Sequence, residues 1–216
     1  MKRNIPLLFI MAIILLGGCV GNKPEENVYS ILEKVATLEN SFKEQQKSIA
    51  ELEKKEQELY KQIIALNMED FDQIVKLSKE ALTTIEEREK RIQEEYDSIK
   101  KSKEEFAKAK SEVEKIKDEK LKERAEQLIE VMSNRYETYE TLYAHYKQAL
   151  SLDKELYEMF QNKELTLEEL QTHIDKINEE YKKVMEENKS FNDYTKSYND
   201  QKEKFYKEAE LTDDTN

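Results

Sequence analysis

The sequence predicts an all-α protein, folded as an antiparallel up-down-up-down four-helix bundle with coiled-coil-like helices of about 40 residues. All three glycines and both prolines lie within the first 24 residues, so the turns that β structure needs lack their usual residues beyond that point. Apolar residues recur with a seven-residue period, which a disordered chain with 39 % charged residues would not maintain. The phase of this repeat changes between four successive segments, and the changes mark the turns.

The first predicted helix covers residues 28–66. Alternate steps of three and four residues from Val28 to Leu66 meet an apolar side chain at every position except Gln45 and Glu56. This period of 3.5 residues predicts a left-handed packing seam. Asn67 and Asp70 have short polar side chains that can cap helix ends, so the first turn is predicted at residues 67–70.

The other three helices follow from the same repeat. The second covers residues 71–113, with a turn near residues 115–120, and the third runs from the candidate N-cap Asp118 to about Phe160. Thr166 and Glu169 have the spacing of a capping box and begin the fourth helix, whose apolar series extends to Phe205. Helices of this length span about 60 Å each, and short connections make neighbours antiparallel.

The N-terminal segment has the features of a lipoprotein signal. Two basic residues precede an apolar run from Ile5 to Leu16, and the sequence Leu16-Gly17-Gly18-Cys19 follows the pattern of a bacterial lipobox. We therefore expect a signal peptide at residues 1–18, a diacylglyceryl group on the Cys19 thiol and an acyl chain such as palmitate on its amine. The parts expected after it are a linker at residues 19–26, a single bundle domain at residues 27–210 and a disordered tail at residues 211–216.

The charge of the chain limits its partners. Removal of residues 1–18, which include Lys2 and Arg3 and no acidic residue, changes the formal net charge from −12 to −14. An acidic surface does not capture nucleic acid, which requires a basic footprint. The expected partners are the membrane, through the lipidated cysteine, and an envelope protein or cell-wall component. The location that follows is extracytoplasmic, on the outer face of the cell membrane.

A family resemblance rests on the whole arrangement. A lipobox, a short linker through Lys23-Pro24-Glu25-Glu26 and four long helices rich in lysine, glutamate and tyrosine resemble the YkyA-like family of cell-wall-binding lipoproteins from Gram-positive bacteria. The resemblance implies an all-α helical-bundle lipoprotein exposed outside the cytoplasmic membrane. It carries no signature of catalytic or binding residues to transfer.

Polar residues interrupt the apolar series and admit two interpretations. They set the register or lie at the boundary of the core, with long side chains reaching water. Alternatively, folding the helices back on one another brings Glu56, Asp153 and His173 to a similar height, where two carboxylates and an imidazole could bind a divalent cation. The interrupting residues are Gln45, Glu56, Glu89, Lys103, Lys110, Arg135, Asp153 and Asn188.

Tyrosines on the third segment form the other candidate site. Tyr136 and Tyr143 lie seven residues apart on one flank, where they either pack in the core with their hydroxyls at its edge or form a binding strip for a peptide or glycan. No catalytic constellation or cofactor motif accompanies them, since neither histidine follows a glutamate by three residues. We therefore predict a lipid-anchored binding or structural protein of the cell envelope, not an enzyme and without a cofactor. The alternative is an accessory cation-binding lipoprotein.

Overall fold

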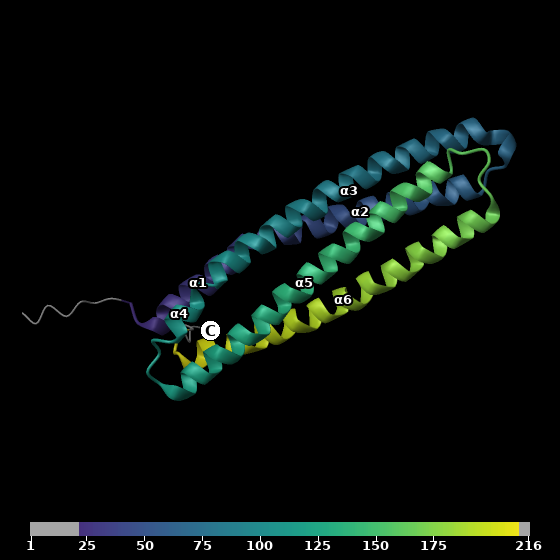
Figure 1. Cartoon of the computed structure of the whole chain (residues 1–216). Coiled ribbons are helices and arrows are strands. Elements are labelled where there is room, and N and C mark those ends of the chain that lie inside the picture. The colour runs from purple at the N-terminus through teal and green to yellow at the C-terminus, as the bar shows by residue number, and fades with distance from the viewer. Residues whose placement is uncertain (1–21, 212–216) are drawn as a thin grey trace, which may run out of the picture.

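A computed structural model describes residues 22–211 of the chain and consists there of helices, turns and short loops, with no strand. Figure 1 shows two long helical hairpins side by side, and the described C-terminal end returns to the end at which α1 begins. This arrangement confirms the predicted all-α, up-down four-helix architecture. The helices are α1 (Pro24–Leu38), α2 (Asn40–Ile64), the short 3₁₀ helix η1 (Met68–Asp70), α3 (Phe71–Phe106), α4 (Ala109–Val113), α5 (Glu119–Met159) and α6 (Leu167–Glu208).

The three predicted turns are confirmed, and side chains stabilise two of the helix starts. The Asp118 carboxylate accepts a hydrogen bond from the Leu121 N–H at 2.9 Å and caps α5. Thr166 and Glu169 form the reciprocal capping box at the start of α6, with distances of 3.2 and 3.0 Å. At the other end of the chain, α1 begins at Pro24, inside the segment predicted as a linker, because proline is compatible with the first helical position.

The first predicted helix is interrupted at Glu39, which separates α1 from α2. The Ser98 hydroxyl of α3 donates to the Leu38 carbonyl at 2.7 Å and accepts from the Phe42 N–H at 3.3 Å. These two backbone groups would pair directly in a continuous helix, so the inserted side chain breaks the helix there. The first predicted helix, over residues 28–66, is therefore observed as the two successive helices α1 and α2. A second break, at residues 107–108, separates α4 from α3.

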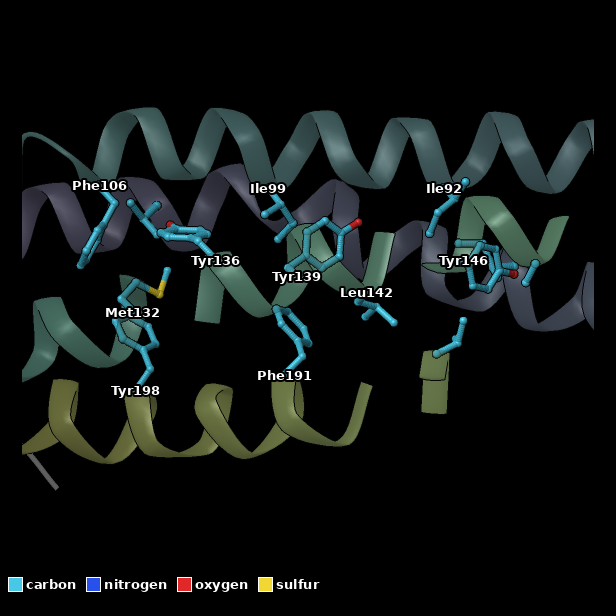
Figure 2. Close-up of a cluster of buried hydrophobic side chains, with 14 of the residues drawn as sticks. Ile92, Ile99, Phe106, Met132, Tyr136, Tyr139, Leu142, Tyr146, Phe191 and Tyr198 are labelled. Carbon is cyan, nitrogen blue, oxygen red and sulfur yellow. The ribbon is translucent and has the colours of Figure 1, made fainter. Parts of the chain in front are cut away.

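The predicted apolar series form the core. Figure 2 shows Ile92, Ile99 and Phe106 of α3 facing tyrosines of α5 and Phe191 and Tyr198 of α6. The sequence placed Glu89, Lys103 and Lys110 at core positions of α3 and α4, and these placements are wrong by one residue. The buried positions are those of a further seven-residue series, Ile74, Ala81, Arg88, Glu95, Ser102 and Ala109, whereas Glu89 and Lys103 are half-buried and Lys110 is exposed. The buried positions lie three residues, and not four, after members of the apolar series that contains Ile92, Ile99 and Phe106.

The two hairpins pack unevenly against each other. α2 packs along α3, α5 packs along α6, and α3 and α5 hold the two hairpins together, whereas α2 and α6 have no comparable packing. The opposite edges of the hairpins meet at Phe42 and Phe191, whose ring centroids lie 5.7 Å apart, and near the chain ends at Tyr29 and Tyr206. None of the helices between residues 22 and 211 is both long and apolar enough to cross a lipid bilayer.

Candidate functional site

A groove runs along the bundle where α2 and α6 do not pack together. It consists of three adjoining cavities, with volumes of about 310, 270 and 690 Å³, that share lining residues such as Gln46, Glu53 and Asn188. Residues of α1, α2 and α6 form its walls, and residues of α3 and α5 form its floor. We call this space the α2–α6 groove. Its largest cavity, floored by Arg88, is called the Arg88 pocket.

The floor of the Arg88 pocket is a buried ion cluster. The guanidinium of Arg88, with 2 % of its side chain exposed, pairs with Glu56, with Asp153 at 3.4 Å and with Glu53 at 3.5 Å. It also donates to the hydroxyls of Tyr146 and Tyr181, both at 2.9 Å. Three acidic side chains thus surround one guanidinium, so the cluster has fewer cationic groups than acidic groups.

Two carboxyl groups of this cluster, those of Glu56 and Asp153, are difficult to ionise. Burial, opposed by Arg88, raises the pKa of Glu56 to about 7, and the neighbouring Asp153 contributes to the rise. Burial likewise raises the pKa of Asp153, against hydrogen bonds from Tyr181 and Arg88. A carboxyl group that is half-protonated near neutral pH responds to any charge that enters the pocket.

Glu95 contributes a second buried carboxyl group to the floor of the groove. It is 1 % exposed and accepts hydrogen bonds from the Tyr139 hydroxyl at 2.8 Å and from the Gln46 side-chain amide at 2.6 Å. None of its described ion-pair or hydrogen-bond partners is a cation. Burial raises its pKa to about 7, with the two hydrogen bonds opposing the rise.

A third buried group lies nearer the chain ends, where the α1–α2 break directs Glu39 inward. The Glu39 carboxylate takes a two-pronged pair of hydrogen bonds from Arg135, at 2.9 and 2.8 Å, and a further one from Ser102 at 2.7 Å. This pair ties the junction of α1 and α2 to α5 under the groove. Because Glu39 occupies Arg135 and the acidic cluster occupies Arg88, both buried arginines of the groove are already neutralised.

The residues predicted to bind a cation come together only in part. Glu56 and Asp153 both reach Arg88, so a guanidinium lies where the prediction placed a metal ion. His173 points elsewhere, and its Nε2 lies 2.8 Å from the Leu152 carbonyl oxygen. Within residues 22–211, no three His, Cys, Asp or Glu side chains converge closely enough to hold a metal ion.

The predicted tyrosine strip lies on a different side of α5 from the groove. Tyr136 is 2 % exposed, packs edge-on against Phe106 and shares a hydrogen bond of 2.6 Å with Ser102. Tyr143 is half-buried and stacks on Tyr96, with ring centroids 4.2 Å apart. The two rings therefore do not form a continuous exposed surface, and Tyr136 has the contacts of a core residue. Cys19, the predicted lipidation site, lies outside the described residues.

Comparison with known proteins places the chain in a family. Residues 23–208 match the model of the YkyA family, described as "Putative cell-wall binding lipoprotein". The chain belongs to this family. Membership confirms the resemblance found in the sequence. It connects the chain with lipoproteins and with the cell wall.

This YkyA-family protein is similar in sequence to a known protein and in fold to a solved structure. The "Uncharacterized lipoprotein YkyA" of Bacillus subtilis (strain 168) is 40 % identical over 90 residues, a segment that covers 42 % of this chain and 40 % of that protein. The crystal structure of "a Conserved Protein of Unknown Function from Staphylococcus aureus" superposes with a TM-score of 0.76 over 84 % of this chain and 91 % of that one, at 23 % identity. At that identity the likeness shows the fold alone.

Sequence reasoning missed Arg88, Glu95 and Glu53. The signal that could have found the first two is the series Ile74, Ala81, Arg88, Glu95 and Ser102, in which charged residues occupy positions seven apart from buried ones. Glu53 has no such signal, since it lies three residues before the seam position Glu56 on a helix rich in glutamate. Its role depends on Arg88 of another helix.

Proposed function

We propose that this YkyA-family chain is a lipid-anchored binding protein on the outer face of the cell membrane, and that it holds an envelope ligand in the α2–α6 groove. The observation that carries the proposal is the open groove itself, which ends in a cavity of about 690 Å³ lined by both apolar and charged side chains. Ligand sites combine these two features, because apolar walls supply affinity and a few polar groups fix orientation.

The anchor in this proposal is Cys19, with its thiol carrying a diacylglyceryl group after removal of residues 1–18. Two or three acyl chains hold a protein on a bilayer where one chain is marginal. An anchored bundle meets envelope ligands at high local concentration, so a modest affinity suffices. Membership in a lipoprotein family supports this location.

The groove supports binding better than catalysis. Arg88 and Arg135 are engaged by carboxylates, and a group held in a buried ion pair is poorly placed to move charge onto a substrate. The two histidines, which would be the usual acid–base residues, contact Glu180 and the Leu152 carbonyl and are not among the residues that line the groove cavities.

Photocrosslinking on intact cells tests the proposal. Met185 lies on the lip of the Arg88 pocket with 65 % exposure, and Met68 lies in the turn between α2 and α3, outside the residues that line the groove, with 61 % exposure. A photoreactive amino acid at Met185 is expected to form adducts with envelope material, whereas the same residue at Met68 is expected to form few. If Met185 forms no adducts, or no more adducts than Met68, the groove is not the binding surface.

A further inference from the structure

We propose that the Arg88 pocket binds a primary amine on a lysine-type side chain, presented by an extended peptide that lies along the α2–α6 groove. The inference rests on the proposed function, because it names the chemistry of the ligand that the groove holds. It depends on three features of the site. These are its excess of carboxyl groups over cations, its apolar wall and the amide side chains on both sides of the groove.

The first feature is charge. Glu53, Glu56 and Asp153 share one guanidinium, and Glu95 adds another carboxyl group to the adjoining cavity. Lys54, exposed on the rim, is the only other basic side chain that lines these two cavities. With Glu56 and Glu95 ionised, four carboxylates face two cations, and the site is then complementary to a positively charged ligand. The same carboxylates would repel an anionic polymer, and both buried arginines are already paired with carboxylates of the protein.

The second feature is the wall beside this charge. Leu156 of α5 and Ile174, Ile177 and Val184 of α6 line the pocket together with Tyr60 of α2. A lysine side chain is an ammonium on a four-carbon stem, so its stem can lie along such a wall while its charged end reaches the carboxylates. Glu53 is the most accessible of them, with 43 % of its side chain exposed.

The third feature separates a peptide from a simple polyamine. Gln46 and Gln57 of α2 face Asn178 and Asn188 of α6 across the groove, and all four side chains are exposed. Each amide carries one oxygen acceptor and two N–H donors, of which Gln46 uses one on Glu95, and such groups match the N–H and C=O groups of an extended backbone. The stretch of α2 from Gln46 to Tyr60 is about 21 Å long, enough for about six extended residues.

Entry of an ammonium group has a consequence for proton binding. The groups that face Glu56 are Glu53 on α2, Arg88 on α3, Asp153 and Tyr157 on α5 and, through Asp153 and Arg88, Tyr181 on α6. At pH 6 the carboxyl of Glu56 is mostly protonated, and at pH 8 it is ionised, whereas a lysine amine stays charged throughout. Binding should therefore strengthen as the pH rises from 6 to 8 and should release protons.

The test measures binding to the full-length lipoprotein in detergent micelles by calorimetry. The probes are an acetylated and amidated alanine hexapeptide with one central lysine, the same peptide with norleucine in place of lysine, and pentane-1,5-diamine. We expect the lysine peptide to bind at least about tenfold more tightly than either of the others. Equal binding of the norleucine peptide would overturn recognition of the amine, and equal binding of the diamine would overturn the choice of a peptide.

Matched variants place the ligand in the groove. Glu53→Gln is expected to weaken binding of the lysine peptide at least about fivefold, whereas Glu58→Gln, an exposed change on the same helix, leaves it unchanged. Met185→Lys is expected to abolish binding and Met68→Lys to preserve it. If the two variants of each pair changed the affinity for the lysine peptide equally, the inference would be overturned. If envelope crosslinking at Met185 persists while no probe binds, this inference fails and the proposed function stands. If the lysine peptide binds but Met185 forms no envelope adducts, this inference stands and the proposed function fails.

Discussion

Glu95→Gln is expected to change how the stability of the bundle depends on pH. Glu95 is 1 % exposed and its pKa is raised to about 7 by burial. A group whose pKa is raised on folding contributes stability below its unfolded pKa and loses it as the pH rises through the folded pKa. The wild-type protein should therefore lose stability as Glu95 ionises, whereas the neutral glutamine has no such loss.

The size of the effect follows from the two pKa values. A carboxyl group with a pKa of 4.5 unfolded and about 7 folded destabilises the folded state by about 3 kcal/mol once fully ionised. Between pH 5.5 and pH 8.5 the change is about 2 kcal/mol, because part of the difference has already developed at the lower value. This range avoids the sequence pI of about 5.0, where the protein would tend to precipitate.

Urea unfolding followed by far-ultraviolet circular dichroism measures the effect. The free energy of unfolding of Glu95→Gln minus that of the wild type should rise by about 2 kcal/mol from pH 5.5 to pH 8.5. A constant offset between the two proteins, from the altered hydrogen bonds to Tyr139 and Gln46, does not affect this slope. Glu87→Gln, an exposed change on the same helix, should give a flat difference. A flat difference for Glu95→Gln as well would refute the assignment of a raised pKa.

Three further predictions concern the anchor, the core and the tyrosines. Cys19→Ser should release the protein from the membrane fraction, and a variant that stays tightly bound after loss of its signal peptide would contradict the lipid anchor. Ile92→Asp should lower the free energy of unfolding by about 4 kcal/mol, because Ile92 is 5 % exposed and lies in the core between α3 and α5; an unchanged urea midpoint would contradict this. Tyr136→Ser should cost about 3 kcal/mol and Tyr143→Ser about 1 kcal/mol, with envelope crosslinking preserved in both. Loss of crosslinking at unchanged melting temperature would instead favour the tyrosine strip.

Periodicity predicted the features of the fold that depend on which face of each helix is buried. The series from Ser78 to Val113 is buried throughout, because a seven-residue apolar repeat leaves a helix one stable way to face its neighbours. The break at Glu39 could not be predicted in this way. It depends on Ser98, a residue almost sixty positions away, which the local sequence near Glu39 does not identify.

The candidate site was only partly predictable for a related reason. Glu56 and Asp153 stood out as polar residues at core positions, and the structure does bring them together. Their partner Arg88 was missed because a helix has two neighbouring seam positions, three and four residues after each apolar one, and the sequence favours neither clearly. The groove depends on the lateral spacing of α2 and α6, which no periodicity within one helix encodes.

The position of the Arg88 pocket along α1 and α2 limits how far from the membrane the pocket can bind a ligand. Helix α1 begins at Pro24, and Glu56 lies 32 residues further along, so the pocket is about 48 Å from the start of the bundle. Four residues separate Cys19 from Pro24, and the five Cα–Cα steps between the two span at most about 17 Å. With Cys19 acylated as proposed, the pocket can capture a ligand no farther than about 65 Å from the bilayer. Seven residues removed from each of the four helices would shorten that radius by about 10 Å while keeping the packing register.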